Sequence, residues 1–546
     1  MKKYVALLLA AMMVLAMLAG CGNNDNSNNS NPGENSNPGN QAATNEGGKK
    51  IPEQLTIVGN TWDGIDMYQV TSWNDGAQGL AADSILTMGD DGRAIPQIAS
   101  NSVWSEDGLT WTLTFPEGMY YSTGEQLEPE DVVASIEHGL EYSSWADGYA
   151  AIESMEINGR DVIFHLTEYQ ADMEFNFMSS FVGVIDKDEL DTMSNEELLW
   201  GCHPYGAYYI DEFQAGAYVI LKANPGYVTH NPLVENKGKV PVETVKVVMG
   251  GEDFTYYTGL INGEYDLLNS APADYLTDLQ AAENVTLVES SCAITGYCEL
   301  NTKNEFLAEE NVRLAIIRGF DRDKWEAYSD DYNDLTYALI QDNSLNYSQE
   351  VWDYYKENYG YDVEAAKQLL ADAGWADTDG DGFVDKGGKK LAFTFSSRDS
   401  DNSVTVAQSL QEDMKAIGID MNITTQDWSY VNQDVREGNF DMAYMSLGWS
   451  EPLLLLNNFC NRSEIDAECT NLDLEGYLEL VAKVRSTVDY DERTQAVADV
   501  QMKLFSYATI MPLLRGTAFR CWNSSLQGVV STATGNLFLN DVYVVE

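Results

Sequence analysis

The sequence predicts an α/β fold built as two lobes of similar construction. From Leu55 onward, short strand-like segments alternate with helical segments of about a dozen residues, which is typical of α/β proteins. A strand–helix–strand pattern also occurs twice, near residues 245–267 and again near 419–442. Both copies carry a Gly-x-aromatic-Asp sequence between the helix and the second strand. A repeated unit is expected when two lobes share one plan, and a chance similarity is the alternative.

Several elements can be assigned from pattern alone. They are strands at 55–58 and 109–115 and helices at 130–140 and 363–373. The second strand alternates strictly between apolar and polar residues, which predicts that it is half-buried. The last helix places its apolar residues on one face, with Asp362 to cap its start and Gly374 to end it.

The first twenty residues predict a signal peptide. Two lysines precede an apolar run from Tyr4 to Leu18, followed by Ala19, Gly20 and Cys21. Residues 18–21 resemble the lipobox of bacterial lipoproteins, which implies cleavage before Cys21 and a diacylglyceryl group on its thiol. Two acyl chains suffice for stable anchoring. A plain secretory signal with a chance cysteine is the alternative.

Residues 21–50 predict a disordered tether. They are rich in Gly, Asn, Ser and Pro and contain almost no bulky apolar residue, so they cannot bury enough surface to fold. A flexible coil of this length holds the folded body roughly 30 Å from the bilayer. The expected location is therefore the outer (or periplasmic) face of the cell membrane.

Composition excludes some partners. The chain has 87 Asp+Glu against 31 Lys+Arg and a formal net charge of -56, so it lacks the basic patches that bind nucleic acid or anionic lipid. The membrane contact is then expected through the lipid anchor alone. The length predicts about three domains, and the 44% hydrophobic content suits packed cores.

Cysteine usage agrees with an exported protein. Six cysteines follow Cys21, and none forms a C-x-x-C motif, so neither a zinc site nor a thioredoxin-like motif is indicated. Cys460 and Cys469 enclose a short polar loop and are the one disulfide we predict. Buried free thiols are the alternative for the other four.

The sequence favours no catalytic or resident metal site. Its four histidines are far apart, and the usual motifs of hydrolases and nucleotide-binding proteins are absent. Asp377, Asp379, Asp381 and Asp385 match part of a calcium-binding EF-hand loop, but Gly388 replaces the glutamate expected at position 12. A surface hairpin turn is the simpler interpretation, with weak calcium binding as the alternative. We expect no cofactor.

The order of short motifs resembles that of the bacterial extracellular solute-binding proteins of family 5. This family includes the oligopeptide- and dipeptide-binding lipoproteins of ABC transporters. None of the motifs is decisive alone, but they follow one another in the family's order over some 450 residues. The resembling segments are 91–99, 105–118, 130–135, 216–218, 224–227, 312–322 and 373–382.

This resemblance implies a periplasmic-binding-protein-like (type II) fold, with two lobes joined by a hinge and an extra inserted domain. It assigns residues 51–95, 205–295 and 506–546 to lobe I, 96–204 to the extra domain and 296–505 to lobe II. The implied function is capture of a small solute, most often a peptide, by hinge closure of a monomer that delivers it to an ABC transporter permease. An exported carboxylate-dependent hydrolase, a sugar-binding transport protein of the same fold, and a surface sensor or adhesin are the alternatives.

The resemblance also locates the ligand contacts where strands end at the cleft. At these places the chain offers Trp62, Tyr297, Trp428, Trp449, Glu451 and Arg515. Oligopeptide-binding members carry an Asp that pairs with the peptide ammonium in a G-W-x-A-D-Y-x-[DE]-P stretch. Here residues 447–452 read LGWSEP, and no A-D-Y remains. We therefore expect this protein not to clamp a free peptide amino terminus in that way.

Overall fold

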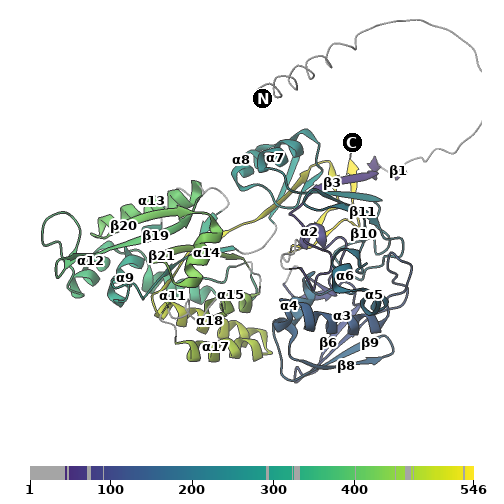
Figure 1. The fold of residues 1–546 in the computed structure, drawn as a ribbon, viewed down its shortest axis with the longest axis horizontal. Helices are drawn as coiled ribbons and strands as arrows, with labels where there is room; N and C mark the ends of the chain where they lie inside the picture. Colours follow the sequence, from purple (N-terminus) through teal and green to yellow (C-terminus); the bar gives the residue numbers. More distant parts are fainter. Residues whose placement is uncertain are drawn as a thin grey trace, which may run out of the picture. The chain divides into compact units, whose positions relative to one another are not determined.

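The computed structural model describes most of the chain from Thr44 onward (Figure 1). Thr44–Glu546 form one compact unit. The predicted signal peptide and Cys21 lie outside the described part. In that part, no helix combines the length and apolar composition that a membrane crossing needs. The described residues are 44–45, 48–70, 75–89, 92–289, 294–322, 324, 333–342, 344–399, 401–448, 451–461, 469–470, 473–532 and 535–545.

A seven-stranded mixed sheet forms the centre of lobe I. Its central strand, β3, pairs in parallel with β12 and β13 and buries Leu55 and Ile57, so the predicted first strand is confirmed. Helices α7 (Asp253–Asn262) and α8 (Leu276–Ala281) connect strands of this sheet. In sheet order the strands are β10 (Tyr208–Gln214), β11 (Tyr218–Ala223), β12 (Thr244–Val248), β3 (Gln54–Val58), β13 (Leu267–Leu268), β23 (Phe519–Asn523) and β14 (Val285–Glu289).

A six-stranded mixed sheet forms the centre of lobe II, and helices pack around it in one hydrophobic core (Figure 1). In sheet order the strands are β16 (Asn333–Leu335), β22 (Ile510–Gly516), β15 (Ile294–Leu300), β21 (Met442–Gly448), β19 (Ala392–Arg398) and β20 (Asp420–Gln426). The helices are α9 (Glu310–Gly319), α11 (Gln349–Tyr359), α12 (Val363–Asp372), α13 (Asp401–Ala416), α14 (Trp428–Glu437), α15 (Pro452–Asn461), α17 (Leu474–Ser486) and α18 (Tyr490–Ser506).

Helix α12 matches the helix predicted over 363–373. The carboxylate of Asp362 accepts a hydrogen bond from the backbone N–H of Ala365, as expected for an N-cap. Gly374 follows the helix with φ of 84°, a conformation that glycine adopts without steric cost. Local sequence signals therefore set both ends of this helix.

The extra domain contains a four-stranded antiparallel sheet covered by helices. Trp111 on β7 is fully buried and stacks on Trp104 of the neighbouring strand, with ring centroids 4.8 Å apart. The core of this domain is continuous with that of lobe I. The strands in sheet order are β6 (Asn101–Trp104), β7 (Thr110–Thr114), β9 (Asp161–Leu166) and β8 (Ile152–Asn158), and the helices are α3 (Pro129–Tyr142), η1 (Ala146–Tyr149), α4 (Met173–Met178), α5 (Lys187–Thr192) and α6 (Asn195–Gly201).

The folded body begins before residue 51, where the tether was expected to end. Residues 44–50 include two short strands, and the second pairs with the C-terminal strand through Lys49 and Lys50. The ammonium of Lys49 also lies 4.1 Å from the ring centroid of Tyr543. Composition did not indicate these strands because, among the described residues, β1 pairs only with β2, and β2 pairs with a strand some 500 residues away. The four-stranded sheet has the order β1 (Thr44–Asn45), β2 (Lys49–Lys50), β27 (Tyr543–Val545) and β24 (Leu526–Gln527).

The remaining elements are short. Three two-stranded sheets pair β4 (Leu86–Met88) with β5 (Ala94–Pro96), β17 (Asp385–Lys386) with β18 (Lys389–Lys390), and β25 (Val530–Ser531) with β26 (Leu537–Phe538). Two further short helices are α2 (Asp75–Gln78) and η2 (Ala273–Tyr275).

The chain crosses between the two large sheets twice. It leaves the first sheet after β14 and enters the second at β15, and it returns between β22 and β23. β22 pairs with β15 and β16 over residues 510–516, so lobe I resumes near residue 517 and not at the expected residue 506. The two crossing strands, β15 and β22, are direct neighbours in the second sheet.

The repeated strand–helix–strand pattern is confirmed as two units of the same topology. β12 and β13 both pair in parallel with β3, and β20 and β21 both pair in parallel with β19. Helices α7 and α14 link the two outer strands in each case and end at Gly263 and Gly438, with φ of 77° and 75°. These left-handed glycines allow the chain to reverse into the next strand.

Candidate functional site

We call β15 and β22, the two strands next to the crossings between the lobes, the hinge strands. The candidate site is the side of the lobe II sheet where β15 begins and β22 ends. Thr295 at the start of β15 pairs with Arg515 near the end of β22 and with Leu447 near the end of β21. We call these three residues, with the segment that follows β22, the hinge edge. In open α/β sheets, ligands bind outside the carboxyl ends of the strands. The hinge edge is therefore the candidate binding site.

Arg515 links the two lobes at this edge. Its Nε lies 2.8 Å from Oδ1 of Asp342 in lobe II, and its Nη2 lies 3.3 Å from Oε1 of Glu289 at the end of β14 in lobe I. Its Nη1 donates to Oγ1 of Thr517, 3.1 Å away. The side chain is 17% exposed, so the guanidinium is held in place yet reaches solvent. Arg515 therefore bridges an acid of each lobe at the hinge edge.

Two of the predicted aromatic contacts are buried. Tyr297 on β15 is fully buried, and its ring lies 5.4 Å from that of Phe459. Trp62, in the segment after β3, is 2% exposed. Its indole N–H is buried and has no hydrogen-bond partner among the described residues. A buried unpaired donor is costly, so this N–H is a group that a solute oxygen could satisfy.

Of the two tryptophans predicted as contacts on lobe II, the structure describes only Trp428. Trp428 is the first residue of α14, directly after the Asp427 cap that follows β20, and it packs partly buried against the lobe II core. It therefore lies on the side of the sheet where the parallel strands end. Trp449 follows β21 but lies outside the described residues.

Glu451 forms its ion pair and hydrogen bonds with other residues of the protein. It is fully buried, forms an ion pair with Arg493 of α18, and accepts hydrogen bonds from the backbone N–H groups of Leu453 and Leu454 at the start of α15. Arg493 also donates to Oδ1 of Asn346 at 2.7 Å. Because Glu451 is fully buried and already paired with a cation, it is not accessible to a solute ammonium. The expectation that the protein does not clamp a peptide amino terminus stays a prediction.

The aspartate-rich loop partly gathers its carboxylates. Ligand oxygens of Asp377, Asp379 and Asp381 lie within 4.8 Å of one another and are exposed. However, Asp381 pairs with Lys390 at 2.6 Å, and the carboxylate of Asp385 accepts from the N–H and hydroxyl of Thr378. The loop leads into the β17–β18 hairpin, as the simpler interpretation predicted. Calcium binding stays an untested alternative.

The predicted disulfide also stays a prediction. Cys469 is fully buried, but the side chain of Cys460 lies outside the described residues. Cys202, Cys298 and Cys521 are buried free thiols, and burial raises the pKa of each. These three are therefore unreactive at neutral pH.

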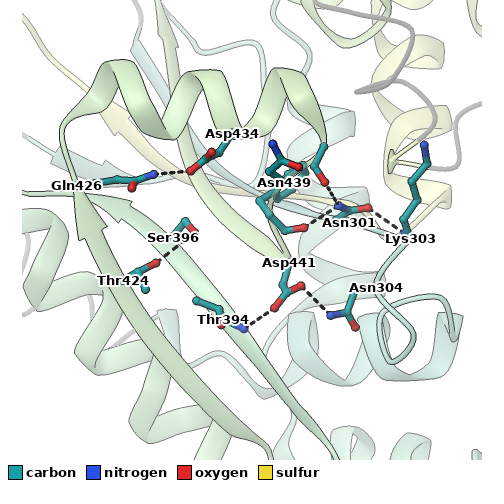
Figure 2. Close-up of a pocket in the computed structure, with 12 residues that line it drawn as sticks. Asn301, Lys303, Asn304, Thr394, Ser396, Thr424, Gln426, Asp434, Asn439 and Asp441 are labelled. Atoms are coloured by element: carbon teal, nitrogen blue, oxygen red, sulfur yellow. Dashed lines mark hydrogen bonds between the residues drawn. The ribbon is translucent and has the colours of Figure 1, made fainter.

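A polar groove of about 530 Å³ lies on lobe II beside α14 (Figure 2). Its side chains include amides, hydroxyls and carboxylates, which together could bind a hydroxylated solute. The residues lining it are Asn301, Lys303, Asn304, Thr394, Ser396, Thr424, Gln426, Asp434, Gly438, Asn439, Phe440 and Asp441.

Most of these polar groups already bind one another. The amide of Asn301 donates to the carbonyl oxygens of Gly438 and Phe440 at 3.2 and 2.6 Å, and its oxygen accepts from the N–H of Lys303. Figure 2 shows the same mutual pairing for Gln426 with Asp434, 2.6 Å apart. These hydrogen bonds hold α14 and the strands of the repeated unit together, so the polar groups serve the fold. The hinge edge is therefore the better candidate for the binding site.

Arg493 and Asp172 are the charged residues that sequence reasoning missed. Both side chains are less than one-tenth exposed and lie where the extra domain meets lobe II. The sequence around Arg493 reads DYDERTQ, which is polar throughout and gives no signal that this arginine is buried. The identity of its partner acid depends on tertiary structure.

The sequence is similar to those of known solute-binding proteins. Residues 93–464 match the model of the bacterial extracellular solute-binding proteins, family 5 Middle. The oligopeptide-binding protein AppA of Bacillus subtilis is 26% identical over 468 residues, which cover 82% of this chain and 81% of AppA. The dipeptide-binding protein of Escherichia coli is 21% identical over 485 residues, or 82% of this chain and 86% of that protein.

Solved structures share the fold. NikA from Brucella suis in complex with Fe(III)-EDTA superposes with a TM-score of 0.77 at 20% identity, covering 90% of this chain and 99% of NikA. AppA from B. subtilis in complex with a nonapeptide gives 0.67 at 19% identity, covering 90% and 99%. The two lobes, the double crossing and the extra domain are therefore those of a periplasmic-binding-protein-like fold. The family match covers more than half of the chain, and the protein belongs to the bacterial extracellular solute-binding proteins of family 5.

Proposed function

We propose that this protein captures a peptide, or another small solute of similar size, at the hinge edge and delivers it to an ABC transporter permease. The observation that supports this most is the pair of neighbouring hinge strands, β15 and β22, which carry the two connections between the lobes. A solute held beside them contacts residues of both lobes, and so binds the closed arrangement more tightly than the open one. The chain makes and breaks no bond of the solute.

Named residues take definite roles in this proposal. The guanidinium of Arg515 still reaches solvent and is the cation for a solute carboxylate, which would replace Glu289 or Asp342 as its partner. The indole N–H of Trp62 is a donor for a solute oxygen. Trp428 offers an apolar wall at the end of the parallel strands. Tyr297, being fully buried, supports the site from within the sheet.

A peptide is the favoured solute class because the relatives named above include an oligopeptide- and a dipeptide-binding protein. The ammonium clamp is not available at Glu451, which Arg493 occupies. A buried ammonium without a partner costs several kcal/mol of desolvation, so peptides must bind with their amino terminus solvated or bound elsewhere. An uncharged solute or an oligosaccharide is the second candidate for the same reason.

Thermal unfolding with defined solutes tests this function. The panel contains peptides of two to nine residues, oligosaccharides and nickel–histidine, each at a fixed concentration. A binder stabilises the folded state by mass action, by about 2.7 kcal/mol at a hundredfold excess over Kd. We expect a peptide to raise the Tm and to be recovered intact by chromatography. Cleavage of the solute would instead identify a hydrolase, and no response to any peptide would contradict the proposal.

We further propose that Cys21 carries a lipid that anchors the protein outside the membrane. Changing Cys21 to Ser removes the thiol that would carry the diacylglyceryl group, so the variant should be released to the medium or stay as an unprocessed precursor. The unchanged chain should remain with the membrane fraction. Equal membrane retention of the Cys21→Ser protein would contradict the anchor without affecting solute capture.

A further inference from the structure

The extra domain contacts lobe II through a cluster of charged side chains away from the hinge edge. The backbone N–H of Ala171 donates to the carbonyl oxygen of Arg485 at 2.9 Å, and Nη2 of Arg485 lies 3.8 Å from Oδ2 of Asp172. Leu345 and Leu454 of lobe II pack against the core that the extra domain shares with lobe I. We define the interlobe cluster as Tyr169 and Asp172 of the extra domain with Glu451, Arg485 and Arg493 of lobe II.

Asp172 is poorly satisfied as a charged group in this contact. Its side chain is 2% exposed, and its Oδ1 has no hydrogen-bond partner among the described residues. The buried Nε of Arg485 likewise lacks a partner there. A distance of 3.8 Å between Asp172 and Arg485 is too long for a direct hydrogen bond. The ionised carboxylate is therefore buried without full compensation, which is unfavourable.

The charges around Asp172 do not offset this cost. From lobe II, Glu451 adds a second negative charge, while Arg493 is already paired with Glu451. From the extra domain, Glu174 is also buried and accepts from the indole N–H of Trp104 at 3.0 Å. Burial, followed by the charge of Glu451, raises the pKa of Asp172 to about 6, and Arg485 lowers it only in part.

A small cavity adjoins the cluster. It has a volume of about 270 Å³ and lies between the extra domain and lobe II. Its lining includes Trp104, Tyr169, Glu174, Tyr490 and Arg493. Half of the lining residues are aromatic or charged and the other half are small or aliphatic, so the contact mixes polar and apolar groups and is not a continuous apolar core. Such a contact can separate at a smaller cost than a packed hydrophobic interface.

Separation of the lobes at this point would change how tightly Asp172 holds a proton. In water the carboxyl group has its ordinary pKa near 4. In the contact the pKa is higher, so closing takes up a proton in the pH range between about 4 and 6. Because the state with the raised pKa binds more protons, it gains stability as the pH falls and loses that gain as the pH rises through 6.

We propose that the interlobe cluster is a proton-linked closure contact, in which protonation of Asp172 favours the closed arrangement of extra domain and lobe II. The ratio of closed to open molecules increases about tenfold from pH 7 to pH 5. The consequence for the solute, tighter retention in mildly acidic medium, rests on the proposed function. The closure itself does not depend on any ligand.

Small-angle X-ray scattering without added solute tests this proposal. The sample is the chain from residue 21 onward with Cys21 changed to Ser, measured from pH 5 to pH 7.5 and fitted as a mixture of open and closed forms. The closed fraction should rise as the pH falls. Asp172→Asn, which is neutral at every pH, should reduce the pH dependence to the part that the buried Glu174 contributes. Glu153→Gln, an exposed acid on β8 of the same domain, is the matched control and should behave as the unchanged chain.

Arg485→Gln provides an independent variant in case Asp172→Asn does not fold. Loss of this cation removes the largest of the contributions that lower the pKa of Asp172, so the midpoint of the transition should move to higher pH. A closed fraction that is constant between pH 5 and pH 7.5 would overturn the proposal. So would an Asp172→Asn curve that matches the unchanged chain, or an unshifted midpoint in Arg485→Gln. None of these outcomes would bear on whether the protein binds a solute.

Discussion

The carboxylate of Asp441 accepts a hydrogen bond from the backbone N–H of Thr394, 2.9 Å away, and so ties the start of β21 to the neighbouring strand β19 (Figure 2). Asp266 does the same in lobe I, where it accepts from the N–H of Thr56 on β3 at 2.6 Å. These are the aspartates of the two Gly-x-aromatic-Asp sequences. In both lobes, the aspartate of the repeated sequence therefore fixes the position of the strand that follows it, β13 or β21, against its parallel neighbour.

Replacing Asp441 by Ala should destabilise lobe II by about 2 kcal/mol, because the variant loses two hydrogen bonds and leaves the N–H of Thr394 unpaired. The second bond comes from the amide of Asn304, 2.8 Å away. Urea unfolding followed by tryptophan fluorescence measures the effect. Asp399→Ala, at an exposed aspartate after β19, is the control and should change stability by less than about 0.5 kcal/mol. Equal stability of the two variants would show that the tie is unimportant.

Glu451 should behave as a structural residue. In Glu451→Gln the buried charge of Arg493 loses its partner, so we expect a loss of about 3–5 kcal/mol in stability. The double variant Glu451→Gln, Arg493→Met removes both charges and should recover part of that loss. Chemical denaturation measures all three proteins. A contact made to the solute would give the opposite pattern, with stability unchanged and affinity reduced.

Much of the fold was predictable because its signals are local. The alternation in β7, the caps of α12 and the glycine endings of α7 and α14 all lie within a dozen residues of the elements they specify. The return of the chain to lobe I was placed too early because β22 has an apolar pattern that suits either sheet. Its pairing with β15, more than 200 residues away, decides the matter.

The candidate site was less predictable for the same reason. Residue type alone could not separate Tyr297, which is fully buried, from Arg515, which keeps 17% of its side chain exposed. Nor could it show that Glu451 already has a partner 42 residues further along the chain. Burial and pairing of this kind are set by tertiary contacts, so sequence patterns reveal which residues suit a site but not which remain available.

The position of the cleft can be tested with the two lobe II tryptophans. Trp428→Ala and Trp449→Ala should each weaken binding of the strongest peptide in the thermal panel, because each removes a large apolar surface expected to contact it. Calorimetry gives the Kd, and a loss of about tenfold or more is expected for at least one variant. Trp352→Ala, at a partly buried residue that packs against the lobe II core beside Tyr337, is the control for a loss of stability alone. Unchanged affinity in both test variants would mean that the cleft is elsewhere.

The central claim is that the protein captures an intact peptide without clamping its amino terminus, and calorimetry with matched free and N-acetylated peptides tests it most directly. The peptide that raises the Tm most is titrated in both forms at the same pH and salt concentration. We expect one peptide per protein, with Kd values for the two forms within about tenfold of each other. A loss of more than about a hundredfold on acetylation, roughly 2.7 kcal/mol, would show that an ammonium clamp exists and would contradict the account.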